Sequence, residues 1–300
     1  MKEIIALIWD FDKTLVDGYM QDPIFEEYNV DPKGFWTQNN EEIKKIEGKG
    51  LWVNHDTFYL NFFLRKIKNE EFKGLNNPKL KELGNKIKFY PGVLEFFRDI
   101  QAAINDNSKY SDNEIKLEHY IISTGFRQMI EGCPLRQYIK KAWGCELIED
   151  ETGMPIEVGY SIDNTTKTRA LFEISKGVGI EDRDNIDVNT KMAESDRRVH
   201  FINMVYIGDG PSDIPAFSVI NKNGGATFAV YPKGNSQALK QVDQLRRDGR
   251  VQMYAEADYS KGTTANMWLT ETVTTLADKI IRDRKDYFKK YNTGTPKHLI

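Results

Sequence analysis

Cysteine is scarce in this sequence, with only Cys133 and Cys145 among 300 residues. They form no CxxC pair and no second cluster, which excludes a disulfide-stapled miniprotein and provides no zinc ligand set. We therefore expect two reduced, partly buried thiols. A chain of this length corresponds to about two domains of 100–200 residues and can bury a full hydrophobic core.

A strong excess of one charge is also missing, since 42 Lys and Arg residues balance 45 Asp and Glu residues to a net charge of −3. This balance argues against a nucleic-acid partner and against a polybasic membrane anchor. Long hydrophobic runs are absent too. The apolar run at residues 4–9 ends at Asp10 and Asp12, so it is too short for a signal peptide or a membrane span. We expect a cytoplasmic protein, and the sequence leaves its oligomeric state open.

Five short apolar runs, the first of them made of β-branched and bulky residues, are typical of strands buried on both faces. They cover residues 4–9, 119–123, 204–207, 226–230 and 253–257. Stretches with the apolar spacing of helices lie between them, and the last predicted helix covers residues 271–291. This alternation predicts an α/β fold with a doubly wound, mostly parallel sheet.

One segment, residues 18–88, interrupts this alternation with aromatic residues at spacings of three and four. These aromatic residues are Trp52, Phe58, Tyr59, Phe62 and Phe63. The pattern predicts a small helical domain at 18–88, with the aromatic stripe as its core, inserted into a larger domain of residues 1–17 and 89–300. Two other segments stand out, because residues 145–162 predict a β-hairpin and the polar residues 181–200 predict a surface loop.

Two carboxylates directly follow the first predicted strand, Asp10 and Asp12 in the sequence Asp-Phe-Asp-Lys-Thr. They emerge at the carboxyl end of that strand, which is the edge where open α/β sheets bind ligands. Two carboxylates this close together are costly unless a positive group lies between them. The pair therefore marks a candidate site.

A second acidic pair, Asp209 and Asp213, follows the predicted strand at 204–207. Gly208 and Gly210 permit a sharp turn and a close approach of the backbone there. Four acids that converge at one sheet edge would repel one another, which predicts a hard divalent cation among them. Oxygen ligands without His or Cys favour Mg²⁺ over zinc.

Two weaker features could bind a phosphate. Ser123, Thr124 and Gly125 lie where the second predicted strand ends, and a hydroxyl and a backbone amide at such a place can donate to a phosphate oxygen. Lys167 lies near the start of a predicted helix, where the helix dipole disfavours a cation. A phosphate and an aspartate would explain its place. Taken singly, the first feature would also be explained by a helix cap, and the second by a solvated lysine.

In this order and at these strand ends, the motifs resemble those of the haloacid dehalogenase superfamily. The matching segments are Asp-Phe-Asp-Lys-Thr from Asp10, Ile-Ser-Thr-Gly ending at Gly125, Lys167, and Gly-Asp-Gly-Pro-Ser-Asp ending at Asp213. The resemblance covers about residues 4–230. It implies a Rossmann-like core, and residues 18–88 stand where the superfamily has its C1 cap. A helical C1 cap is similar to that of the phosphoserine phosphatase-like branch.

The resemblance also implies a role for each acid. Asp10 is the expected nucleophile, which forms an aspartyl-phosphate, and Asp12 is the expected general acid and base. Asp10, Asp209 and the backbone carbonyl of Asp12 would coordinate Mg²⁺, while Asp213 would hold a metal-bound water or Lys167. The residues expected to bind the phosphoryl oxygens are Ser123, Thr124, Gly125 and Lys167.

The expected function is magnesium-dependent hydrolysis of a small phosphate monoester. Asp12 favours phosphoryl transfer over cleavage of a carbon–halogen bond, because a halide leaving group needs no proton. Two alternatives stay open. A phosphotransferase or phosphomutase could pass the same aspartyl-phosphate to another hydroxyl, and a binding protein could keep the fold without turnover.

Some positions depart from the phosphoserine phosphatase pattern. Lys13 stands where Gly or Ser is commoner, and its charge faces either the site or solvent. Tyr19 occupies the place of a glutamate that meets the amino group of phosphoserine, so it is a candidate substrate contact instead. Glu26 and Glu27 could replace that glutamate or lie on a solvated helix face. Arg127 could contact a second anionic group of the substrate or form a surface salt bridge.

Overall fold

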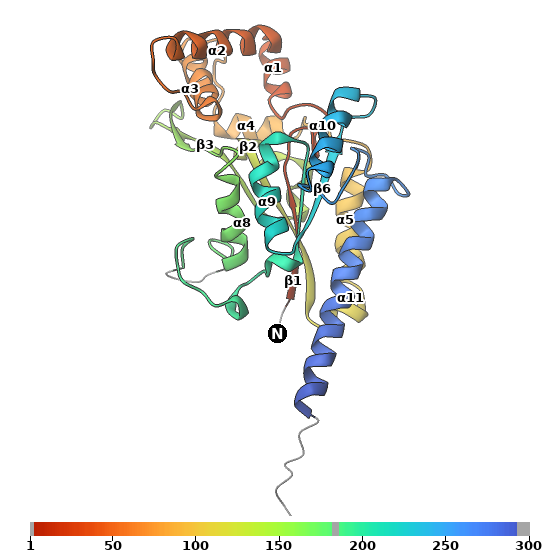
Figure 1. Ribbon diagram of the computed structural model, residues 1–300. Coiled ribbons are helices and arrows are strands. Elements are labelled where there is room, and N and C mark those ends of the chain that lie inside the picture. The colour runs from red at the N-terminus through yellow and green to blue at the C-terminus, as the bar shows by residue number, and fades with distance from the viewer. Residues whose placement is uncertain (1–2, 182–185, 293–300) are drawn as a thin grey trace, which may run out of the picture.

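A seven-stranded sheet in the order β4-β3-β2-β1-β5-β6-β7 forms the centre of the computed structural model, which describes residues 3–181 and 186–292 (Figure 1). The strands are β1 (Glu3–Trp9), β2 (Ile115–Phe126), β3 (Ile139–Glu149), β4 (Pro155–Tyr160), β5 (Met204–Gly208), β6 (Ala226–Tyr231) and β7 (Met253–Glu256). All neighbouring pairs are parallel except β3 with β4. The predicted α/β fold with a mostly parallel sheet is confirmed.

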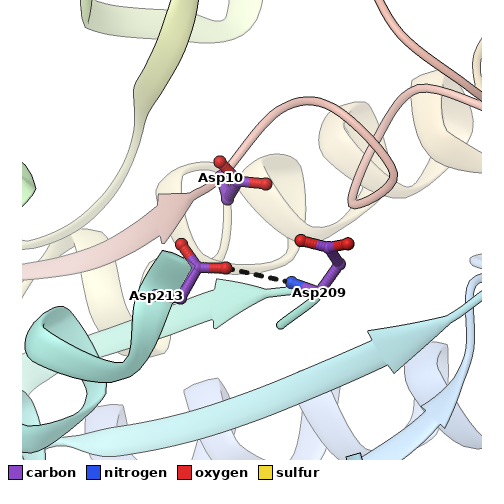
Figure 2. A group of neighbouring side chains, drawn as sticks. All are labelled: Asp10, Asp209 and Asp213. Carbon is purple, nitrogen blue, oxygen red and sulfur yellow. Dashed lines mark hydrogen bonds between the residues drawn. The ribbon is translucent and has the colours of Figure 1, made fainter. Parts of the chain in front are cut away.

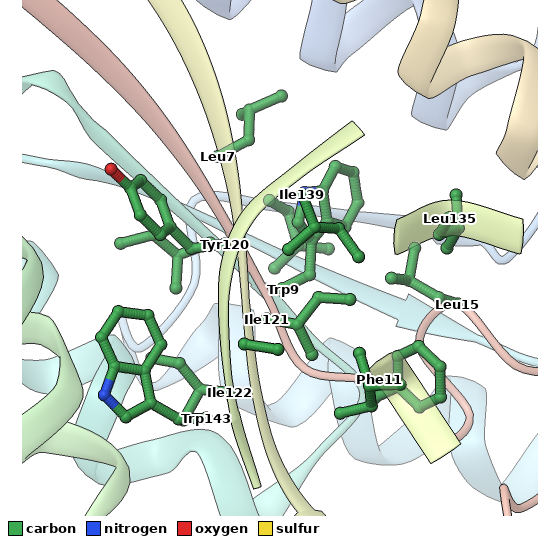
Figure 3. Packing of buried hydrophobic residues seen from close by; sticks show 14 of the residues in the cluster. Leu7, Trp9, Phe11, Leu15, Tyr120, Ile121, Ile122, Leu135, Ile139 and Trp143 are labelled. Atoms are coloured by element: carbon green, nitrogen blue, oxygen red, sulfur yellow. The ribbon is translucent and has the colours of Figure 1, made fainter. Parts of the chain in front are cut away.

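Strand β1 lies at the middle of the sheet because Ile4 to Trp9 are all apolar and buried. Parallel strands are covered on both faces, so they favour such continuous apolar runs. Figure 3 shows Leu7 and Trp9 of β1 among Tyr120 and Ile121 of β2, within one hydrophobic core. The five predicted strands are all present.

Helices cover both faces of the sheet. The helices after the first insertion are α5 (Val93–Asn105), α6 (Ser108–Ser111), α7 (Arg127–Gly132), α8 (Lys167–Lys176), α9 (Ile214–Lys222), α10 (Ser236–Arg247) and α11 (Thr264–Asn292). Helices α5 and α11 contact each other on one side, while α8 and α9 contact each other on the other (Figure 1). The last helix begins seven residues earlier than predicted and packs against α5, β1 and β7. No helix in the described ranges is both long and apolar enough to cross a bilayer.

Residues 18–88, the helical insertion, carry α1 (Asp22–Tyr28), α2 (Pro32–Glu47), α3 (His55–Lys68) and α4 (Asn77–Gly84). Helices α1 to α3 stand above the edge of the sheet where β1 ends (Figure 1). Phe35 and Phe63 pack with ring centroids 4.6 Å apart, and Phe63 stacks on Phe72 at 5.2 Å. Helix α4 packs on α7 of the larger part of the chain, so the insertion is not separated from the rest at its end. The domain boundaries at 18 and 88 stay a prediction.

The predicted aromatic stripe needs one correction. Tyr59, Phe62 and Phe63 are buried, and Phe58 is half-buried, as a core stripe requires. Trp52 is fully exposed instead. The reason is local, because residues 48–54 form the loop between α2 and α3 and do not continue the helical spacing that the stripe assumes.

The two other predicted segments differ in outcome. The hairpin at 145–162 is confirmed by β3 and β4, although β3 begins earlier, at Ile139, and first pairs in parallel with β2. Of the predicted surface loop at 181–200, residues 182–185 lie outside the described residues. Its end is not a surface loop, because Arg198 is buried and donates to Glu118 and Tyr120 of β2.

Both cysteines are free and buried, as expected. Burial raises the pKa of the Cys133 thiol to about 12 and that of the Cys145 thiol to about 11. A thiol with so high a pKa holds its proton at neutral pH and is a poor nucleophile. The structure therefore gives neither cysteine a reactive role.

Candidate active site

Three acidic side chains meet at the carboxyl ends of β1 and β5. Asp10 follows β1, Asp209 follows β5, and Asp213 ends the short 3-10 turn Pro211–Asp213 (Figure 2). One carboxylate oxygen of each lies within 4.8 Å of the others. Because β1 and β5 are parallel neighbours, these carboxyl ends necessarily lie at the same edge. The predicted convergence is confirmed for these three acids.

Lys167 supplies the positive charge between two of these acids. It is the first residue of α8, is only 1% exposed, and donates to Asp10 Oδ1 at 2.6 Å and to Asp213 Oδ1 at 2.7 Å. Burial alone would lower the pKa of Lys167, but the charges of the two carboxylates raise it well above its usual value. The lysine therefore stays charged. The predicted aspartate partner is confirmed.

Asp10 is held at both oxygens, because Lys167 binds one and the Thr14 hydroxyl donates to the other at 2.9 Å. Burial outweighs these contacts and raises the pKa of Asp10 to about 6. The two hydrogen bonds, to Lys167 and to Thr14, fix the Asp10 side chain in position. A fixed carboxylate with a charged neighbour is suited to nucleophilic attack.

Asp213 has no oxygen free of donors. Its Oδ1 accepts from Lys167 and from the Tyr206 hydroxyl at 2.8 Å, and its Oδ2 accepts from the backbone amide of Asp209 at 3.2 Å. A Cβ at Gly208 would lie 2.3 Å from that Oδ2, so only glycine fits there. This arrangement agrees with the prediction that Asp213 holds Lys167. Tyr206 was not predicted, since only the tertiary contact gives its hydroxyl a partner.

Asp209 is the opposite case. Within the described ranges its carboxylate accepts no hydrogen bond, and its burial together with the charges of Asp10 and Asp213 raises its pKa well above the usual value. Lys167 and Lys13 attract this carboxylate, but no cation within the described ranges forms an ion pair with it. An oxygen-only donor set of Asp10 and Asp209 fits Mg²⁺, which binds protein sites through one or two carboxylates.

Asp12 is not part of the three-acid cluster. Its Oδ1 accepts from the backbone amide of Met20 at 2.7 Å, so the side chain turns toward the start of the helical insertion. Burial and the charge of Asp10 raise the pKa of Asp12 to about 7. The suggestion that its backbone carbonyl binds metal stays a prediction.

The predicted phosphate motif lies inside the last part of β2. Ser123 is buried, and its hydroxyl oxygen accepts from the Gly125 amide at 3.0 Å. A Cβ at Gly125 would come within 2.4 Å of the Met20 sulfur. Because the Met20 amide holds Asp12, this close approach places the motif beside the loop that follows β1.

The comparisons with known proteins agree with this picture. No family profile matches the chain. An uncharacterised protein of Borreliella burgdorferi is 37% identical over 292 residues, which cover 91% of this chain and 97% of that protein. The chain belongs to the same family as this relative.

Solved structures extend the comparison. A HAD family hydrolase of Salmonella enterica serovar Typhi matches with a TM-score of 0.50 at 15% identity, over 85% of this chain and 68% of that chain. A probable phosphoserine phosphatase of Vibrio cholerae matches with a TM-score of 0.52 at 14% identity, over 91% of this chain and 66% of that chain. The fold is that of the haloacid dehalogenase superfamily.

Lys13 and Tyr19 lie together at the start of the region where this fold has its cap. Lys13 has a left-handed backbone (φ 57°), and its Nζ lies 4.3 Å from the centre of the Tyr19 ring. Burial alone would lower the pKa of Lys13, but Tyr19 and the charges of Asp209 and Asp12 raise it, so the lysine stays charged. Tyr19 also borders a cavity of about 530 Å³, and its contact with substrate stays a prediction.

The other candidate substrate contacts have partners elsewhere. Arg127 forms ion pairs with Glu146 and, at 3.0 Å, with Glu131, so the salt-bridge alternative is favoured. Glu26 forms an ion pair with Lys88, and Glu27 forms ion pairs with Lys79 and Lys86, all within the helical insertion. Both glutamates are exposed, and these contacts favour the alternative of a solvated helix face.

Two residues of α3 lie near the site, and neither was predicted as a site residue. Asp56, in the first turn, is half-buried and has no hydrogen bond or ion pair within the described part of the chain. Burial raises its pKa, and the charges of Asp163 and Lys167 act on it as well. Tyr59, one turn later, donates to the backbone carbonyl of Thr124 at 2.6 Å. Neither residue lies in a motif, so only the packing of α3 reveals them.

Proposed function

We propose that this protein is a magnesium-dependent phosphatase that hydrolyses a small phosphate monoester through an aspartyl-phosphate on Asp10. The observation that carries the proposal is the fixed Asp10 carboxylate, hydrogen-bonded to buried Lys167 at 2.6 Å and adjacent to Asp209, whose carboxylate accepts no hydrogen bond from the described residues. This arrangement offers a nucleophile and a cation to a phosphate at one sheet edge. Helices α1 to α3 stand above it and would act as the cap (Figure 1).

The reaction has two steps. In the first, an oxygen of Asp10 attacks phosphorus, the bond from phosphorus to the ester oxygen breaks, and Asp12 gives its proton to the leaving alkoxide. In the second, Asp12 takes a proton from water, the resulting hydroxide attacks phosphorus, and phosphate leaves while the Asp10 carboxylate is restored. The first step needs Asp12 within reach of the leaving alkoxide oxygen, and the second needs it within reach of the attacking water.

Charge around the phosphoryl group must supply most of the rate. Proton transfer contributes about 10²- to 10⁴-fold, while hydrolysis of a phosphate monoester can require up to about 10²¹-fold. Lys167 lies beside Asp10 and would bind a phosphoryl oxygen, as would Ser123 and the amides of the Thr124–Gly125 segment. Mg²⁺ held by Asp10 and Asp209 would supply further positive charge to the same oxygens.

The test is release of phosphate from p-nitrophenyl phosphate, with Mg²⁺ and with EDTA. We expect activity only with Mg²⁺, no turnover in Asp10→Asn, and a loss of about 10²- to 10⁴-fold in Asp12→Asn. Asp99→Asn is a matched control, because Asp99 is exposed and pairs only with Arg98 among the described residues. An Asp10→Asn protein that releases phosphate at the wild-type rate would contradict the proposal.

A panel of esters then identifies the organic half of the substrate. Amino-acid, sugar, nucleotide and choline-type phosphates would be compared at equal concentration. A strong preference for one class names the headgroup, whereas equal rates indicate a hydrolase of broad specificity.

A further inference from the structure

Tyr59 links the helical insertion to the predicted phosphate motif. The side chain is 8% exposed, and its hydroxyl donates to the Thr124 carbonyl at 2.6 Å. Its ring packs edge-on against Phe126, as does the ring of Phe63 one turn further along α3. One face of α3 therefore lies directly on the end of β2.

The Thr124 carbonyl has a second donor on the core side. Cys145 of β3 places its Sγ 3.1 Å from the same oxygen. Burial raises the pKa of Tyr59 well above its usual value, so the phenol keeps the proton that it donates. Two protonated side chains, one from the helical insertion and one from the sheet, thus hold a single carbonyl.

Fixing this carbonyl also fixes an amide. In a planar trans peptide the C=O and the N–H point in opposite directions. The N–H of the Thr124–Gly125 peptide belongs to Gly125, and it points at the Ser123 hydroxyl, 3.0 Å away. The hydroxyl of Tyr59 and the amide of Gly125 therefore act on opposite sides of one peptide plane.

We propose that Tyr59 is a positioning residue that couples docking of α3 to the phosphate-binding peptide. With α3 docked, the Tyr59 hydroxyl turns the Thr124 carbonyl toward the helical insertion and the Gly125 amide toward the Ser123 hydroxyl, which would in turn donate to a phosphoryl oxygen. Without that contact, the thiol of Cys145 is the one side-chain donor left to the carbonyl among the described residues, and a thiol is a weak donor. The peptide plane is then held less firmly. This inference rests on the proposed function.

The expected effect is a loss of phosphate affinity without a loss of the metal site. One hydrogen bond to the carbonyl contributes about 3- to 10-fold to an equilibrium. We therefore expect Tyr59→Phe to weaken binding of inorganic phosphate by about that factor in the presence of Mg²⁺. Affinity for Mg²⁺ alone should change less than twofold, because Tyr59 contacts neither Asp10 nor Asp209 in the described structure.

Isothermal titration calorimetry with inorganic phosphate and with Mg²⁺ measures both quantities. Cys145→Ala removes the other donor without altering α3, and we expect it to weaken phosphate binding in the same direction. In the double variant, the loss should exceed the product of the two single losses, because each donor compensates for the other. Tyr110→Phe is the matched control, since Tyr110 is buried and donates to Asp278 instead.

The outcomes separate the two proposals. If the wild-type protein hydrolyses p-nitrophenyl phosphate with Mg²⁺ but Tyr59→Phe and Cys145→Ala both bind phosphate as tightly as wild type, the positioning role is wrong and the proposed function stands. Equal loss of phosphate and Mg²⁺ affinity would indicate a general disturbance of the site and would also overturn it. A wild-type protein that neither binds phosphate nor hydrolyses the ester would refute the proposed function itself.

Discussion

Replacing Asp209 by Asn should make the metal-free protein more stable. Asp209, Asp10 and Asp213 lie together, and Lys167 is the cation that contacts the cluster. The Asp209 carboxylate has no hydrogen-bond donor within the described ranges, so the substitution removes a charge without breaking a contact. An amide of nearly the same shape takes its place.

The distance sets the size of the effect. Two like charges within 4.8 Å of each other repel by at least about 3 kcal/mol at an effective dielectric constant of about 20. Asp209 faces two such charges, and attraction to Lys167 offsets roughly one of them while attraction to Lys13 offsets part of the other. A net gain of about 1–3 kcal/mol in the free energy of unfolding follows, and each kcal/mol corresponds to roughly 2–4 °C in the unfolding midpoint.

Thermal unfolding at pH 8, with EDTA and with Mg²⁺, measures this effect. Wild-type protein should gain about 2.7 kcal/mol when Mg²⁺ is present at about 100 times its Kd. Asp209→Asn should gain little, because it has lost one of the two carboxylates that fit the ion. The difference between the two midpoints should therefore shift in favour of wild type by the equivalent of about 2.7 kcal/mol between EDTA and Mg²⁺, while Asp99→Asn should behave as wild type.

Two results would refute this reasoning. A metal-free Asp209→Asn protein that is less stable than metal-free wild type would show that the carboxylate is not repelled by its neighbours. Equal stabilisation of both proteins by Mg²⁺ would show that the ion binds elsewhere.

Two substitutions outside the acid cluster test the substrate contacts. Arg127→Ala should have a KM for p-nitrophenyl phosphate within about twofold of the wild-type value, because the Arg127 guanidinium is already ion-paired with Glu131 and Glu146. A much larger KM would instead show that Arg127 contacts the substrate. Asp56 should repel a substrate carboxylate, so the wild-type protein should hydrolyse phosphoethanolamine faster than phosphoserine. Asp56→Asn should reduce the ratio of kcat/KM for phosphoethanolamine to kcat/KM for phosphoserine by about 3- to 10-fold, roughly 1 kcal/mol. An unchanged ratio would show that Asp56 does not face the substrate.

The strands that carry the acids could be predicted because their sequence signal is local. Residues buried on both faces of a parallel sheet must be apolar without interruption, as in β1, and a charged residue directly after the run marks its carboxyl end. Strand β3 was missed at its start, because Lys140 and Lys141 break the apolar run. Trp52 was misassigned, because spacing alone does not show where a helix begins.

Other features depend on partners far away in the chain. Arg198 lies in a segment without apolar periodicity, yet it is buried because Glu118 and Tyr120 of β2 accept its hydrogen bonds. The hydroxyls of Tyr59 and Tyr206 likewise reach their partners only after the sheet and α3 are assembled. A pattern in one sequence records burial and periodicity, but it does not record such pairings.

The hydrogen bonds also separate two acids that the sequence presents as equivalent. Asp209 and Asp213 are four residues apart in one motif, and either could be a metal ligand by composition alone. Asp213 is already bound by Lys167, Tyr206 and a backbone amide, so a metal ion would have to displace these donors. Asp209 would lose no donor and would relieve its repulsion from Asp10. The ion should therefore bind Asp209 directly, while Asp213 acts on the reaction through the lysine that it holds against Asp10.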